Sequence, residues 1–83
     1  MVIFGLIDEN ENVLRLVNEN GKYTLTNDKE CSVYTTNTIA KAVKSKSGGL
    51  GNHDLPYCPS DFFGKLKVVQ LAVNVVATYE NKV

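Results

Sequence analysis

The sequence predicts an α+β fold, in which a small antiparallel sheet of four to five strands carries one packed helix. Three observations predict this class. Apolar segments separated by turn-forming residues fill the first 35 positions. A lysine-bearing helical pattern covers residues 36–46, and an apolar strand pattern returns at residues 65–79. The expected order is therefore β-β-β-β-α-β, with the helix and the sheet forming two layers.

The length of 83 residues, with 43% apolar and 22% charged residues, indicates one ordinary globular domain over residues 1–83. A single core of this size stabilises a chain by only a few kcal/mol and leaves little room for a deep active site. The longest apolar stretch, residues 68–77, is too short for a transmembrane helix. No basic leader precedes Asp8, so we expect a cytoplasmic protein without a membrane partner.

The first four strands are expected in the N-terminal part of the chain. Residues 2–7 are apolar on both alternating faces, which is typical of a strand covered on two sides. Asn20-Gly21 predicts a tight hairpin between strands at residues 13–17 and 22–26, because both turn residues tolerate positive φ. A short fourth strand is expected at residues 31–34.

The third of these strands alternates in polarity. Tyr23 and Leu25 share one face, and Lys22, Thr24 and Thr26 share the other. We therefore expect one face of this strand to be exposed to solvent.

The helix is expected at residues 36–46, where Thr35, Thr36 or Asn37 can cap its first turn. At 100° per residue, four apolar residues gather on the side opposite the lysines. These are Ile39, Ala40, Ala42 and Val43. We expect Ile39 and Val43 to anchor the helix in the core. Gly48 and Gly49 are expected to end it.

Residues 47–64 form a loop that is long for so small a domain, and loops of this length are usually functional or mobile. A single helical turn is expected near residues 59–63, with Phe62 and Phe63 closing the edge of the core. In the last strand, residues 65–79, the apolar positions change parity near Val68-Val69. A β-bulge there would reconcile the two parities.

Two groups of residues have the composition, but not the spacing, of a phosphate-binding loop and of a zinc or catalytic thiol site. Residues 48–51 are glycine-rich but follow the helix, whereas phosphate-binding loops precede one. Cys31, His53, Asp54 and Cys58 lack the paired spacing of a structural zinc site and the support that a catalytic thiol needs. We expect reduced cysteines, no metal, no cofactor and no enzyme activity.

Charge divides the chain although the formal net charge is zero. Residues 1–30 carry six acids against three bases, and residues 31–83 carry six bases against three acids. The lysines of the helix and of the following strand are candidate contacts for phosphates, or else a solvated face. They are Lys41, Lys44, Lys46, Lys65 and Lys67. The sequence pI of about 6.5 differs from the basic pI that is typical of nucleic-acid-binding domains.

An apolar knob and the last strand are candidate contact surfaces. Leu55 and Tyr57 alternate with Pro56 and stand before Pro59, which suits an interface anchor. The alternative is that both side chains fold back over the open end of the sheet. Apolar residues on both faces of the last strand predict a two-fold homodimer, tested by replacing Val73 or Val76.

The layout from Val33-Tyr34-Thr35-Thr36 through the Ala-Lys helix to the closing strand resembles small accessory proteins of tailed bacteriophages. The resemblance concerns layout and spans about residues 20–75. It implies a phage-encoded protein of the host-takeover or anti-defence type, which inhibits or redirects a host system by binding. We therefore expect a small non-enzymatic protein that contacts a host protein in the host cytoplasm. RNA or single-stranded nucleic-acid binding through the lysine-bearing helix is the alternative.

Overall fold

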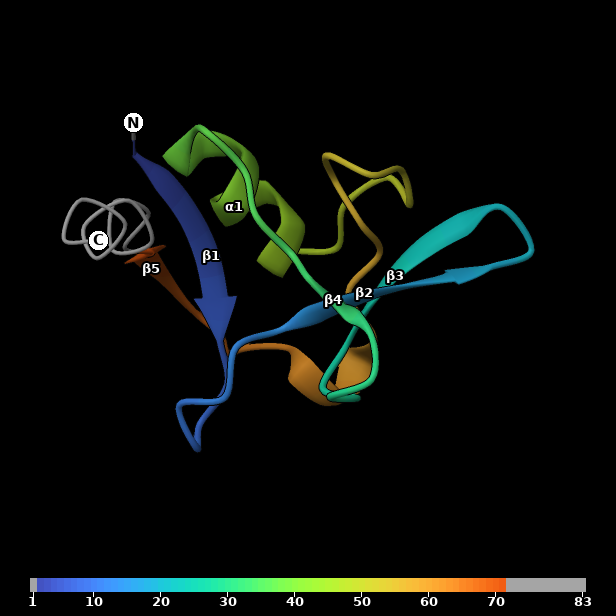
Figure 1. Ribbon diagram of the computed structural model, residues 1–83, viewed down its shortest axis with the longest axis horizontal. Helices are drawn as coiled ribbons and strands as arrows, with labels where there is room; N and C mark the ends of the chain where they lie inside the picture. Colours follow the sequence, from blue (N-terminus) through green and yellow to red (C-terminus); the bar gives the residue numbers. More distant parts are fainter. Residues whose placement is uncertain (1, 72–83) are drawn as a thin grey trace, which may run out of the picture.

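The computed structural model describes residues 2–71 and confirms the α+β class. Figure 1 shows the elements in chain order. They are β1 (Ile3–Ile7), β2 (Arg15–Glu19), β3 (Lys22–Thr26), β4 (Ser32–Val33), α1 (Ile39–Lys46), the 3-10 helix η1 (Ser60–Phe62) and β5 (Lys67–Leu71). The order β-β-β-β-α-β is confirmed, with η1 inserted before β5. Residues 72–79 of the expected last strand, with Val73 and Val76, lie outside the described residues.

The strands form two small antiparallel sheets where the sequence predicted one. β1 pairs with β5, and β2 lies between β3 and β4. The chain bends between β1 and β2, where the Asp8 carboxylate accepts hydrogen bonds from the backbone N–H groups of Asn10 and Asn12. An isolated bridge between Ile7 and Val13 continues across the bend. As a result, the β2–β3 hairpin projects away from β1 and β5 (Figure 1).

The hairpin between β2 and β3 confirms the turn prediction. Asn20 and Gly21 both have positive φ, at 56° and 86°, and the Asn18 side chain accepts a hydrogen bond from the Gly21 N–H at 2.8 Å. β3 occupies the predicted residues. β2 begins later than predicted because the Leu14 N–H donates to the Leu6 carbonyl of β1, at 2.8 Å.

The start of α1 was predicted three residues too early. Thr36 is still extended, because its backbone exchanges two hydrogen bonds with Phe4, at 2.8 and 2.9 Å. The N-cap is therefore Thr38, whose hydroxyl accepts from the Lys41 N–H at 3.3 Å. At the other end, Gly48 has a φ of 101°, which confirms the predicted glycine termination.

The buried face of α1 also differs from the prediction. Ala42 is buried as predicted, together with Ser45, which was not predicted. The other predicted residues are exposed: Ala40, Ile39 (55%) and Val43 (43%). The buried Tyr34 hydroxyl lies 3.1 Å from the Ser45 hydroxyl, and this polar contact faces the core. An unpaired buried hydroxyl is costly, so this pair fixes the rotation of the helix about its axis. In that rotation Ile39 and Val43 face the solvent.

One cluster of buried residues joins the two sheets and the helix. Its members are Leu6, Leu14, Leu25, Tyr34, Ala42, Cys58 and Leu66. Phe62 of η1 packs against this cluster as predicted, whereas Phe63 is exposed. Cys31 and Cys58 are free thiols.

β5 is regular, so the predicted bulge at Val68-Val69 is wrong. Its pairing with β1 is continuous from Ile7↔Lys67 to Ile3↔Leu71. Val68 packs against the core, while Leu71 on the opposite face leans over Gly5, where an added Cβ would lie 2.9 Å from its side chain. Because both faces of β5 are partly covered, the change of apolar parity needs no extra residue.

Within residues 2–71, the helices are too short and too polar to cross a membrane.

Candidate functional site

The loop after α1 is folded on itself by backbone hydrogen bonds. The Leu55 carbonyl accepts from the N–H groups of Leu50 and Gly51, at 2.8 and 2.7 Å, and the Asn52 side chain accepts from the Leu55 N–H at 2.7 Å. Gly49 lies so close to this turn that an added Cβ would come within 2.7 Å of the Leu55 carbonyl oxygen. The glycines therefore permit a tight turn in this segment.

The same loop is attached to the outer edge of β3. The Tyr23 N–H donates to the Gly51 carbonyl, and the Tyr23 carbonyl accepts from the Tyr57 N–H, at 2.7 and 2.8 Å. The Leu25 N–H donates to the Tyr57 carbonyl at 2.8 Å. Thr24, which faces Tyr57 in a parallel bridge, is only 8% exposed. The prediction of an exposed polar face on β3 is therefore wrong at Thr24.

A second attachment joins the loop to α1. The Tyr34 hydroxyl donates to the Asp54 carbonyl at 3.0 Å and also contacts the Ser45 hydroxyl. Burial raises the pKa of Tyr34, and hydrogen bonding to Ser45 and Thr36 offsets part of that rise. The Lys41 ammonium lies 3.7 Å from the Asp54 carboxylate. The loop is thus held from β3 on one side and from α1 on the other.

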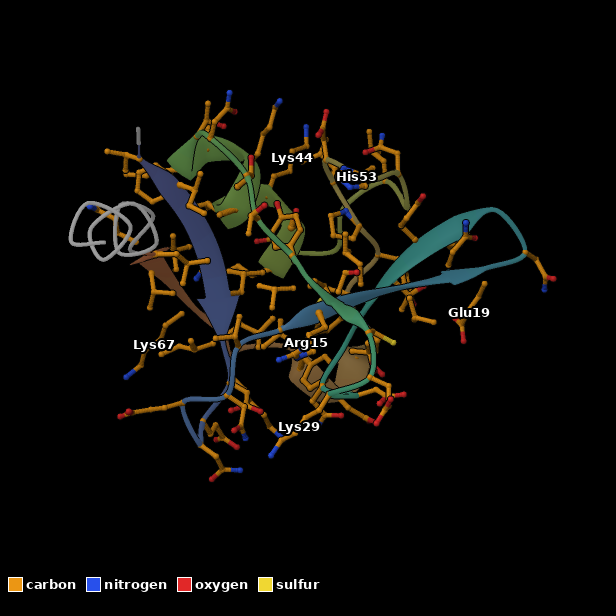
Figure 2. All side chains as sticks on the ribbon, in the orientation of Figure 1. Arg15, Glu19, Lys29, Lys44, His53 and Lys67 are labelled. Carbon is orange, nitrogen blue, oxygen red and sulfur yellow. The ribbon has the colours of Figure 1, made fainter. Side chains whose placement is uncertain are left out.

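Four exposed residues are named here the loop surface: Leu50, His53 and Tyr57 of the loop, and Lys22 of the adjoining strand β3. The Lys22 stem runs over Gly51, and its ammonium lies 4.3 Å from the centre of the Tyr57 ring. Tyr57 is 39% exposed and Leu50 is 69% exposed. The His53 ring meets Tyr23 edge-on, with ring centres 5.4 Å apart. Figure 2 shows His53 on the loop beside α1.

Leu55 and Tyr57, the two knob residues, have different positions. The backbone of Tyr57 covers the edge of β3, while its ring remains partly exposed beside Lys22. The backbone of Tyr57 therefore covers the sheet, as one alternative expected, and a contact role for its exposed ring stays a prediction. Leu55 is half-buried, and its carbonyl closes the turn, which indicates a structural role.

The helix lysines differ in their surroundings. Lys41 is half-buried beside Asp54, whereas Lys44 is exposed. Lys46 lines an open hollow of about 350 Å³. The other lining residues are Ser47, Phe63, Gly64 and Leu66.

The two strand lysines lie elsewhere. Lys65 lines a separate hollow with Asp8, Glu9 and Asp61, where acids outnumber it. Lys67 is exposed on β5, and Figure 2 shows it well apart from Lys44, on the other side of β1. The five lysines therefore do not meet in one basic surface.

The candidate metal and thiol residues do not form a reactive centre in the described part of the chain. Residues 2–71 hold no group of three or more His, Cys, Asp or Glu side chains placed to bind a metal ion. Burial raises the pKa of Cys58, which disfavours the thiolate that a nucleophile needs. His53 is exposed and lies 3.9 Å from the Asp54 carboxylate.

Lys22, Leu50 and His53 were not predicted as contact residues. Lys22 belongs to the β2–β3 hairpin, whereas Leu50 and His53 belong to the loop after α1. No local sequence pattern joins these two segments, because the helix and its approach separate them along the chain. Their proximity follows from the parallel bridge between Thr24 and Tyr57.

Comparisons of the chain with protein-family models, with curated proteins and with solved structures find no match.

Proposed function

We propose that this is a small non-enzymatic binding protein whose loop surface contacts another protein. The observation that carries the proposal is the double attachment of the loop. It is attached to β3 through Gly51 and Tyr57, and through Asp54 to Tyr34 and to Lys41 of α1. A loop that is already ordered loses little conformational entropy on binding. Exposed Leu50 and Tyr57 then serve as preformed anchors.

The chemistry of the loop surface suggests the kind of site that it fits. Tyr57 offers an apolar ring and a hydroxyl, and Lys22 beside it adds a positive charge that favours an acidic rim. We infer a partner with an apolar pocket bordered by carboxylates. The resemblance to accessory proteins of tailed bacteriophages supports a host protein as that partner, and inhibition or redirection of its activity as the outcome.

Nucleic-acid binding through the lysine-bearing helix is less well supported. Lys41 is paired with Asp54, and Lys65 lies among acids. Lys22 already lies over the ring of Tyr57, where a stacked base would have to replace it.

The test is capture of partners from a bacterial lysate by the tagged protein, with and without nuclease. We expect a nuclease-resistant protein partner that the wild type retains and the double variant Leu50→Ser/Tyr57→Ala loses. The matched control is Lys44→Glu/Lys46→Glu, which reverses helix charges without touching the loop surface. It should retain the same partner.

The opposite pattern would contradict the proposal. If nuclease abolished capture, and the lysine variant lost binding while the loop variant kept it, nucleic acid would be the partner. Lys41 is left unchanged in both variants because its replacement would also disturb Asp54. Circular dichroism of each variant should match the wild type.

A further inference from the structure

The outer edge of β5 carries backbone groups without a partner among residues 2–71, because β1 is the only strand that pairs with β5 there. On β1, the N–H and carbonyl of Phe4 bond to Thr36, and the Leu6 carbonyl accepts from Leu14. These groups point away from β5. In an antiparallel ladder their counterparts opposite, Gln70 and Val68, must also point away from β1.

The side chains of this edge do not discourage pairing. Natural edge strands are commonly protected by charges, prolines or bulges. Lys67 is the single charged residue of β5, at its first position, and the strand has neither proline nor bulge. The outer edge of β5 is therefore open to pairing with another strand.

We propose that a second copy of the chain pairs antiparallel with β5 about a two-fold axis at Val69. In this register Val68 of each copy lies opposite Gln70 of the other, so all four outward-pointing residues find backbone partners. A shift by one residue would place Val68 opposite Val69, whose backbone groups already point towards β1. With the axis at Val68, only Val68 would face an outward-pointing residue of β5 in the second copy. With the axis at Gln70, only Gln70 would do so.

The same register is favourable for the side chains. Val69 lies opposite Val69 of the second copy, which buries two half-exposed apolar groups. Lys67 lies opposite Leu71 of the second copy, so no like charges meet. The pairing converts two sheets of two strands into one sheet of four, with the order β1-β5-β5-β1. This surface is separate from the loop surface, so both contacts can be made at once.

The first test removes one outward hydrogen-bond donor. Gln70→Pro deletes an N–H that does not bond to β1, so the β1–β5 ladder survives. Gln70→Ala keeps that N–H and is the matched control. We expect light scattering to give twice the chain mass for the wild type and for Gln70→Ala. Gln70→Pro should weaken dimerisation by roughly tenfold or more.

The second test fixes the register by cross-linking, and it decides the question even if Gln70→Pro fails to fold. In a Cys31→Ser background, Val69→Cys should form an intermolecular disulfide under mild oxidation, because residues directly opposite lie within bonding range. Gln70→Cys should not, since the two thiols would be offset along the strands. Equal cross-linking of both variants would overturn the register.

A wild-type monomer at high concentration would overturn the proposal. Slow hydrogen exchange of the Gln70 amide in such a monomer would show that another segment of the chain occupies the edge.

Discussion

The outer edges of β3 and β5 are completed differently. At β3, Tyr23 and Leu25 bond to the backbone of Gly51 and Tyr57, so the loop after α1 replaces a missing strand. At β5, the outward groups of Val68 and Gln70 have no partner among residues 2–71. Helix α1 shows the same contrast. Lys41 lies beside Asp54 of the loop, and Ser45 contacts Tyr34, which bonds to the same Asp54. Ile39 and Val43 are exposed.

This contrast shows that a long loop can be a structural element and a contact surface together. Its backbone covers β3, and its side chains remain available outside. Substitutions on the loop side should therefore cost more stability than substitutions of equally apolar residues on the exposed side of α1. Four predictions test this difference, beginning with the largest expected effect.

Gly49→Ala should destabilise the protein by about 3 kcal/mol, since the new Cβ would collide with the carbonyl oxygens of Leu55 and Pro56. Denaturant unfolding measures the loss, and hydrogen exchange of the Tyr23 and Leu25 amides should become faster. Gly48→Asn is the control. Gly48 has free space around it, and asparagine tolerates positive φ, so the cost should be smaller. Equal losses would mean that the loop is not held at Gly49.

Tyr34→Phe should cost about 1–3 kcal/mol, because it removes the hydroxyl that joins Ser45 to the Asp54 carbonyl. Ser45→Ala should cost somewhat less. In the double variant the losses should be less than additive, because no buried hydroxyl is then left without its partner. Additive losses would show that the two hydroxyls do not interact.

Alkaline pH should weaken the fold through the same tyrosine. The pKa of Tyr34 is raised by burial, so the folded state holds this proton more tightly than the unfolded state. Its stabilising contribution is complete below the unfolded pKa of about 10 and is lost as pH rises through the folded pKa. Tyr34→Phe should therefore reduce the fall in unfolding free energy above about pH 10. An unchanged pH profile would contradict this assignment.

Ile39→Ala and Val43→Ala should each cost under about 1 kcal/mol, because both side chains are largely exposed. Ala42→Leu, on the buried face of the same helix, should cost about 1–3 kcal/mol through overpacking. Thermal unfolding of the three variants measures the contrast. A loss above about 2 kcal/mol for Ile39→Ala would instead show that this side chain is buried in the core, as the sequence predicted.

Local sequence patterns predicted the features that depend on a few neighbouring residues. Asn20-Gly21 defined the hairpin because positive φ at two adjacent positions suits only a tight turn. Gly48 ended α1 for the same reason. Neither feature needs information from a distant segment.

The helix face and the candidate site depended on distant contacts. Periodicity favoured Ile39 and Val43 as the buried residues of α1. The helix instead faces the core with Ser45, whose hydroxyl bonds to the buried Tyr34 hydroxyl. The predicted bulge at Val68-Val69 was wrong because apolar residues can change from one face of a strand to the other without a bulge when both faces are partly covered.

The sequence by itself determined the α+β class, the order of the strands around one helix, the hairpin and the helix end. Each of these follows from backbone preferences and from apolar spacing over a few residues. Only the tertiary structure decided that the sheet divides in two, that the loop covers β3, and that Lys22 lies over Tyr57. These features depend on segments far apart in the chain. The loop covers β3 because the N–H groups of Tyr23 and Leu25 need partners, and the loop backbone supplies them.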